Sequence, residues 1–154
     1  MDWPALFALT NAVAVAGWLA LALLPRRPLV LSLILFAGIG LLCAAYAAML
    51  VALLAGVVDP ARVPGSPPYD AADYSIAGIR KLFLSDGGIV LGWTHYLAFD
   101  LFVGLWIARD ADGRRVGRLV QVLFLLATFL AGPIGLLAWL AGRRWLTRVV
   151  REGA

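Results

Sequence analysis

The sequence predicts an all-α integral membrane protein of one domain, residues 1–154, with four transmembrane helices. Of its 154 residues, 63% are hydrophobic and 14% are charged, whereas a soluble domain carries about 25% charged residues. The apolar residues gather in four segments, each long enough to cross a hydrocarbon core of about 30 Å as a helix. These segments cover about residues 4–24, 29–55, 88–108 and 119–142.

The charged residues and the single cysteine exclude several other classes of site. The net charge of +4 does not indicate nucleic acid as a partner, because the arginines lie at the ends of the apolar segments, where membrane proteins keep them. Cys43 lies inside an apolar run, so we expect it to pack between helices, without a disulfide within the chain or a cysteine metal cluster. We expect the first segment to be a helix and not a signal peptide, since Asp2 precedes it in place of basic residues.

The first two segments predict an antiparallel pair of helices. Pro4 suits the first turn of a helix, and the turn Pro25-Arg26-Arg27-Pro28 sends the chain back. Asn11 either hydrogen-bonds to a neighbouring helix or lines a site, and Tyr46 is the one hydroxyl-bearing aromatic residue of the second segment. Glycines and alanines of the second segment allow close helix approach, so a homo-oligomer is compatible with the sequence.

The longest predicted loop covers residues 56–87. Four apolar residues in it recur on one helical face: Ile76, Ile79, Leu82 and Phe83. This spacing predicts a short amphipathic helix, at about residues 71–84, that lies on the membrane surface. It either connects two spans or covers a site at that side of the membrane.

The fourth segment contains Gly132-Pro133-Ile134-Gly135. A proline inside a helix removes one hydrogen bond and clashes with the carbonyl four residues before it, here that of Phe129. We therefore expect a kink in this helix, with the freed carbonyl satisfied by Thr128 or by a neighbouring helix.

The basic residues leave the sidedness open. Asp2 before the first segment and Arg26-Arg27 after it favour an N-terminus outside the cell. With four crossing helices, six Lys and Arg then lie inside and seven outside, so the count does not decide. The composition is rich in Ala, Arg and Gly, as in many bacterial proteins, and we expect a multi-pass protein of the bacterial inner membrane.

The third segment holds the candidate catalytic residues. It contains His95, the one histidine of the chain, and Asp100, an acid well inside an apolar segment. An ionised side chain at such a depth costs roughly 2.5–3.5 kcal/mol on insertion scales, so it marks a functional site by default. The two side chains lie about 140° apart around an ideal helix, so they do not pair directly but can flank one cavity or face two neighbours.

The depths of four polar residues within the predicted spans suggest a polar slot across the bundle. Asn11, Tyr46 and His95 fall at similar depth, and Asp100 lies about 7–8 Å deeper at 1.5 Å per residue. An apolar setting favours the uncharged forms of a carboxyl group and of an imidazole. A neutral acid and a neutral base together suit proton transfer, although each side chain also fits a purely structural role in helix packing.

Metal and cofactor chemistry have little support in the sequence. One histidine cannot build the multi-histidine site of a di-iron hydroxylase, and there is no glycine-rich phosphate loop or nucleophile motif. We expect no metal and no cofactor.

The residues around the acid carry a family resemblance. The stretch Gly-Trp-Thr-His-Tyr-Leu-Ala-Phe-Asp-Leu-Phe-Val-Gly, residues 92–104, resembles the signature of the ABA4-like family, small four-helix membrane proteins named after the plant abscisic-acid-deficient 4 protein. An arginine commonly follows this motif in the family, where Leu105 stands here. The resemblance extends over nearly the whole chain, through these further matches: Asn11, Gly17-Trp18, Gly78, Arg80, Phe83, Asp110, Thr128-Phe129 and Gly132-Pro133-Ile134-Gly135.

The resemblance implies a role in carotenoid metabolism, because the plant member is required for neoxanthin formation from violaxanthin. Opening an epoxide to an allene is an internal isomerisation that needs one proton delivered to the oxygen and one removed from the polyene. Asp100 as acid and His95 as base would fit it. The residues expected to bind the substrate are Asn11, Tyr46, Trp93, Tyr96, Phe99, Phe102 and Trp106.

Three functions follow as hypotheses. The first is an enzyme, or an enzyme subunit, that isomerises a carotenoid or a similar apolar isoprenoid without a cofactor. The second is a non-catalytic module that binds pigment or assists assembly. The third is a small proton-coupled exporter, although the chain lacks the first-helix glutamate on which small multidrug exporters rely.

Overall fold

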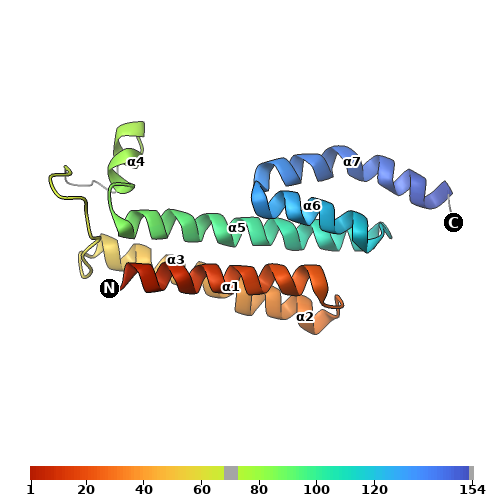
Figure 1. The fold of residues 1–154 in the computed structure, drawn as a ribbon, viewed down its shortest axis with the longest axis horizontal. Helices are drawn as coiled ribbons and strands as arrows, with labels where there is room; N and C mark the ends of the chain where they lie inside the picture. The colour runs from red at the N-terminus through yellow and green to blue at the C-terminus, as the bar shows by residue number, and fades with distance from the viewer. Residues whose placement is uncertain (68–72, 153–154) are drawn as a thin grey trace.

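The structure, a computed structural model, describes residues 1–67 and 73–152, with side chains as far as residue 148. Its helical elements, in chain order, are α1 (Trp3–Leu23), α2 (Pro28–Leu33), the π-helix η1 (Ile34–Gly40), α3 (Leu41–Leu54), α4 (Ile76–Leu82), α5 (Asp86–Gly113), α6 (Arg118–Leu130) and α7 (Gly132–Glu152). The long helix α5 runs through the middle, with α1, α2 and α3 on one side and α6 and α7 on the other (Figure 1). The predicted all-helical class is confirmed.

The core forms where α5 meets α1 and the second helical stretch. Leu101 is fully buried, and its side chain lies against the backbone of Gly17 on α1 and of Gly38 on η1. On the next turn, the ring of Trp18 lies against Gly104. The glycines thus let three helices approach closely around α5, which is how membrane helices gain packing contacts without a hydrophobic driving force.

The second predicted span is one continuous stretch with a change of winding at its centre. The range predicted at 29–55 corresponds to α2, η1 and α3, which together cover Pro28–Leu54. Seven residues of it, Ile34–Gly40, wind as a π-helix, which the apolar spacing did not indicate. Such segments are rare and often lie at functional sites.

The amphipathic helix is shorter than predicted. Of the range 71–84, the structure has α4 at Ile76–Leu82, and residues 71 and 72 lie outside the described residues. Ser75 begins the helix by accepting a hydrogen bond from the Gly78 amide at 3.1 Å, and Phe83 ends it with φ −75° and ψ 0°. Ile76 and Ile79 are exposed, as an element on a membrane surface requires.

The third span extends beyond its predicted range of 88–108. α5 begins at Asp86, where Ser85 accepts a hydrogen bond from the Gly88 amide at 3.1 Å, and it continues to Gly113. The continuation past residue 108 was missed because it is polar. Asp110 and Asp112 in this last turn are neutralised by arginines, so the helix persists into the region that the sequence assigned to a loop.

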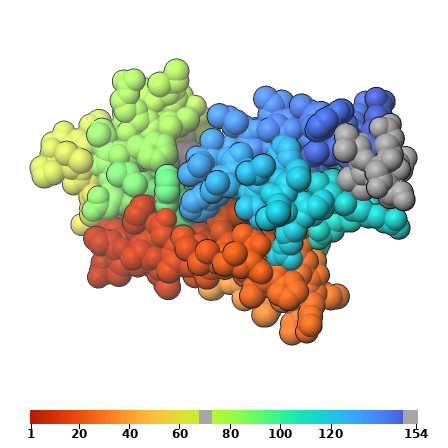
Figure 2. Space-filling model, turned by 45° about the vertical axis from the view of Figure 1, so that its right-hand side comes forward, coloured from red at the N-terminus to blue at the C-terminus, as the bar shows by residue number. Residues whose placement is uncertain are grey.

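The fourth predicted span, 119–142, is not one continuous helix in the structure, and a fourth transmembrane helix is not confirmed. The chain is helical as α6 as far as Leu130, leaves the helical conformation at Ala131, with φ −157° and ψ 84°, and starts α7 at Gly132. The helix α7 then runs back beside α6, so the two form a hairpin over part of α5 (Figure 1). The space-filling view shows this hairpin in cyan and blue (Figure 2).

The reversal has a local cause in the sequence. Pro133 cannot continue α6, because it lacks an N–H group and its ring clashes with the carbonyl of Phe129, but it fits the first turn of a new helix. The amides of Ile134 and Gly135 both donate to the Ala131 carbonyl, at 2.9 and 3.1 Å. Gly135 lies directly against the Thr128 backbone, so the two helices touch at the turn.

Three helical stretches in the described part of the chain are long and apolar enough to cross a membrane: Trp3–Leu23, Pro28–Leu54 and Asp86–Gly113. The helix α6 has 13 residues, or about 20 Å at 1.5 Å per residue, which is too short to span a core of about 30 Å. The helix α6 by itself is therefore shorter than a transmembrane helix.

The α6–α7 contact predicts a large effect from a small substitution. A Cβ at Gly135 would lie 2.5 Å from the Thr128 Cα, whereas a Cβ at Gly142, on the same helix, would lie 3.7 Å from Phe124. We expect Gly135→Ala to lower the free energy of unfolding in detergent by about 1–3 kcal/mol. Gly142→Ala is the matched control and should match the wild type in the same thermal melts. Equal stability of both variants would contradict the tight turn.

Candidate functional site

Asp100 lies where the tip of the hairpin touches α5. The residue is only 9% exposed, and its carboxyl group lies against the Cα of Gly132, the first residue of α7. Within the described residues, its Oδ2 is buried without a hydrogen-bond partner. The carboxyl group therefore lies at a helix N-terminus, where the partial positive charge favours an anion.

A row of polar and aromatic side chains leads from Asp100 toward the end of α5 that carries α4. The Tyr96 hydroxyl lies beside the Asp100 carboxyl group, and the ring of Tyr96 stacks on Trp93 with 5.2 Å between centroids. The indole N–H of Trp93 donates to Asn11 Oδ1 on α1 at 3.1 Å. The structure thus brings four predicted site residues together: Asn11, Trp93, Tyr96 and Asp100.

His95 belongs to a second group on another side of α5. Its side chain is exposed and stacks on Phe99 with 4.6 Å between centroids. Tyr46 of α3 lies against the same imidazole at 5.6 Å. His95 and Asp100 do not contact each other, so the structure separates the two candidate catalytic residues into different groups.

The two groups nevertheless border one surface of α5. Around the helix, at about 100° per residue, Phe99 and Tyr96 lie within the arc of about 140° between His95 and Asp100. Exposure falls steadily along this arc, from the exposed His95 and Phe99, through the half-buried Tyr96, to the buried Asp100. The hairpin meets the arc at Asp100, so the outer part of the arc is open to whatever surrounds the helix.

The two remaining aromatic candidates, Phe102 and Trp106, lie farther along α5. Both are exposed, and the Arg143 guanidinium of α7 lies 5.8 Å from the ring centroid of Trp106. Trp106 is thus a packing partner of the hairpin. Neither residue takes part in the aromatic contacts around Asp100 or His95 in the described part of the structure.

Sequence reasoning missed Gly132 and Phe7 as members of the site. Gly132 was noted only as part of a kink, although glycine before Pro133 indicates a point where another group comes close to the backbone. The ring of Phe7 lies 6.0 Å from that of Trp93. It had no distinguishing signal, because an apolar residue in a span is normally a lipid or packing contact.

Charged residues at the far end of α5 hold the hairpin in place. Asp110 Oδ2 accepts hydrogen bonds from Arg114 at 3.0 Å, from the Trp139 indole at 3.0 Å and from Arg143 at 3.4 Å. Because Trp139 and Arg143 both belong to α7, this carboxylate fixes the returning helix on α5. Trp139 is fully buried.

A neighbouring cluster joins the α1–α2 turn to α6. Arg26 Nη1 donates to Asp112 Oδ1 at 2.8 Å, to the Ala108 carbonyl at 3.1 Å and to the Gln121 side chain. The Arg118 guanidinium donates to backbone carbonyls at the end of α1. These contacts position the hairpin and do not reach Asp100.

The described residues contain no group of three His, Cys, Asp or Glu side chains that could together hold a metal ion. The ionisable groups near the arc are Asp100, Tyr96, His95 and Tyr46, on α5 and α3. The site can therefore supply or accept protons and can stack against a flat apolar molecule.

Comparison with known proteins identifies a family. The model of the family described as ABA DEFICIENT 4-like matches residues 5–139, which include α1, the arc of α5 and the hairpin turn. The predicted resemblance is thereby confirmed. No curated protein and no solved structure matches the chain.

The contact between α1 and α5 at this site is open to a direct measurement. We expect Asn11→Ala and Trp93→Phe each to destabilise the protein, and the double variant to show a coupling of about 0.6 kcal/mol, as for other hydrogen bonds between membrane helices. Unfolding in mixed detergent micelles gives the four free energies of the cycle. Purely additive effects would show that the two side chains do not interact.

Proposed function

The chain belongs to the ABA4-like family, and we propose that it is a membrane enzyme, or a subunit of one, that isomerises a carotenoid or a similar isoprenoid by acid–base chemistry. The observation that carries this proposal is the buried Asp100 carboxyl group with a free oxygen beside the uncovered arc of α5. The reaction class follows from the family, whose plant member is required for conversion of an epoxide to an allene.

Asp100 is the proposed acid. In an apolar setting a carboxyl group is most stable with its proton. Its Oδ2 is buried without a geometric hydrogen bond to the described residues, and the neighbouring polar group is the Tyr96 hydroxyl. When the proton leaves, the N-terminus of α7 beside the carboxylate stabilises the new negative charge. The surroundings of Asp100 therefore stabilise both the protonated and the ionised carboxyl group.

The proposed reaction is balanced without a cofactor. The Asp100 proton passes to the epoxide oxygen, the bond between this oxygen and the polyene-side ring carbon breaks, and the oxygen becomes a hydroxyl group. A base removes a proton from the neighbouring polyene carbon, and the electron pair of that C–H bond completes the allene. Return of this proton to Asp100 resets the site.

His95 is the proposed base. It lies at the opposite border of the arc, with its ring aligned against Phe99 and Tyr46. A substrate that reaches both residues must lie across α5, in contact with Tyr96 and Phe99 between them. Trp93 and Tyr96 offer a stacked aromatic surface for a polyene, and exposed residues along the arc allow entry from the bilayer.

We expect Asp100→Asn to lower turnover by 10²–10⁴-fold, the usual contribution of a general acid, while pigment still co-purifies. The asparagine keeps the shape of the side chain beside Gly132, so thermal melts serve as the control for folding. Turnover is measured by pigment chromatography after co-expression with violaxanthin biosynthesis. Unchanged pigment with the wild type, or full turnover with Asp100→Asn, would contradict the catalytic proposal; bound but unaltered pigment would favour a binding module.

His95→Gln in the same assay distinguishes two candidates for the base, His95 and the Asp100 carboxylate. Loss of turnover on the same scale supports His95 in that role. Retained turnover removes it, and the Asp100 carboxylate formed in the first step is then the remaining base at the site.

We also propose that the N-terminus lies outside the cell and the C-terminus inside. Because the hairpin returns, ten of the thirteen Lys and Arg residues gather at the end of the molecule that carries the α1–α2 and α5–α6 turns. Only Arg62, Arg80 and Lys81 lie at the other end. An excess of Lys and Arg of this size predicts that this end of the molecule faces the cytoplasm. Four full spans would divide the same residues almost evenly between the two sides.

Cysteine labelling tests this arrangement. In a Cys43→Ala background, we expect Pro64→Cys to react with a membrane-impermeant maleimide in intact bacteria, and Arg144→Cys to react only after permeabilisation. Both positions are exposed. Labelling of the two positions from the same side would show that α6 and α7 together cross the membrane and that the hairpin is wrong.

A further inference from the structure

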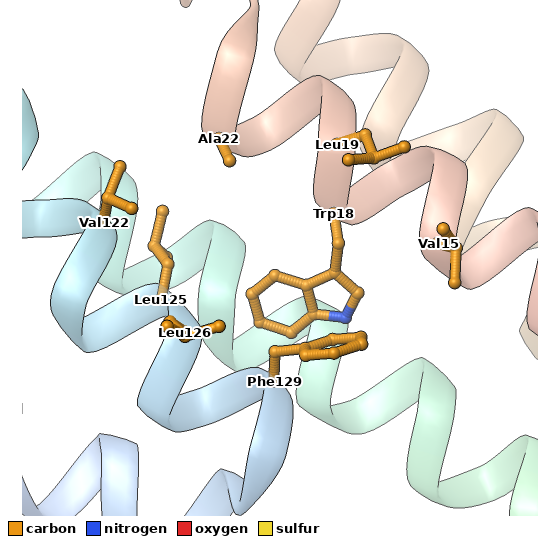
Figure 3. A pocket seen from close by; sticks show the side chains of 8 residues that line it. All are labelled: Val15, Trp18, Leu19, Ala22, Val122, Leu125, Leu126 and Phe129. Atoms are coloured by element: carbon orange, nitrogen blue, oxygen red, sulfur yellow. The ribbon is translucent and has the colours of Figure 1, made fainter.

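An apolar groove lies between α1 and α6 (Figure 3). None of the residues that line it belongs to the group around Asp100. The volume of the groove is about 230 Å³, less than the roughly 300–1,000 Å³ of pockets that hold a whole small ligand. It therefore fits a part of a larger molecule. Its lining is wholly hydrophobic and consists of Val15, Trp18, Leu19, Ala22, Val122, Leu125, Leu126 and Phe129.

Two aromatic side chains form the base of the groove. Trp18 and Phe129 point toward each other from α1 and α6 (Figure 3), with ring centroids 5.6 Å apart and an edge-to-face angle of 75°. Trp18 is held in this position because its ring lies against Gly104 of α5. Leu19 and Leu126 at the rim are exposed, so the groove opens toward the bilayer.

Residues of the groove lie close to residues of the candidate site on three elements. On α1, Val15 lies one helical turn from Asn11, which holds the Trp93 indole. On α6, Phe129 lies three residues before Gly132, which touches the Asp100 carboxyl group. Gly104, under the Trp18 ring, is one turn from Asp100 on α5. These spacings place the apolar groove next to the polar row.

We propose that this groove binds the unreacting hydrocarbon chain of the isoprenoid substrate while its oxygenated end lies at Asp100. The assignment rests on the proposed function and adds to it a second binding region. A long polyene needs an apolar contact beyond its reacting end, and because the bilayer is itself apolar, the groove favours the polyene through close packing contacts. The hairpin, which reaches only as far as Asp100, supplies one wall of the groove.

A second groove distinguishes a substrate from ordinary bilayer lipid. It lies between α1 and the α2–η1 stretch, has a volume of about 260 Å³, and includes Ala16 and Ala37 in its lining. A lipid acyl chain fits either groove. Only the groove between α1 and α6 continues to Asn11 and Asp100, so only there can one molecule fill the groove and reach the acid.

The two grooves provide a matched pair of variants on α1. Ala22→Leu fills the groove between α1 and α6, and Ala16→Leu fills the other one with the same side chain. In lipid nanodiscs titrated with violaxanthin, we expect Ala22→Leu to weaken binding about tenfold, equivalent to about 1.4 kcal/mol, and Ala16→Leu to bind like the wild type. Val122→Phe, which fills the first groove from α6, should repeat the Ala22→Leu result.

A shortened epoxide that keeps the ring but lacks the distal polyene gives the second measurement. We expect it to bind the wild type and Ala22→Leu equally, because it does not reach the groove. Equal violaxanthin binding by the wild type, Ala22→Leu and Val122→Phe, or equal weakening by Ala16→Leu, would overturn the groove assignment and leave the proposed function intact. Absence of violaxanthin binding by the wild type would overturn both.

Discussion

The close contact between the hairpin turn and Asp100 is the constraint on which the rest of the structure depends. A chain that reverses at Ala131 and Gly132 places a helix N-terminus against a buried carboxyl group, and only a residue without a side chain permits that approach. Irregular backbone at membrane depth is tolerated only where protein or a water-filled cavity surrounds it. The turn needs the cover of α5, and Asp100 needs the helix N-terminus of the turn. Each therefore accounts for the presence of the other.

The position of the turn is fixed from the opposite end of the hairpin. Asp110 holds Trp139 and Arg143 of α7, and Asp112 and Arg26 join α5 to the α1–α2 turn and to α6. These contacts join ion pairs with the packing of the buried Trp139 ring. The lengths of α6 and of the first part of α7 then set the distance from these contacts to the turn. The depth at which the hairpin ends beside α5 is thus determined at the basic end of the molecule.

The sequence predicted the structure where a single residue, or the length and spacing of apolar residues, determines it. Apolar length placed α1, the second helical stretch and α5 within a few residues, and the cost of an acid in lipid singled out Asp100. The reversal at Gly132 was not predictable from length, because residues 119–142 are as apolar as a true span. Pro133 indicates a kink and a turn equally well, and the outcome depends on the Asp110 and Arg143 contacts between residues far apart in the chain. The separation of His95 from Asp100 was predictable from helical geometry. The contact of His95 with Tyr46, in contrast, depends on how α3 packs against α5.

A hairpin that ends partway along α5 also explains how so short a chain can build a site open to the bilayer. In a bundle of four full spans, the other three would cover the arc of α5 along its whole length, and a bulky apolar molecule would have to separate them to enter. The hairpin turn meets α5 at Asp100, and Trp93 and Phe99, which precede Asp100 on α5, are exposed. The α1–α6 groove is lined by residues of α1 and α6, and Asp100 lies between it and these exposed aromatic residues. Asp100 is buried there, whereas Tyr96 and Phe99 of the adjoining arc are more exposed.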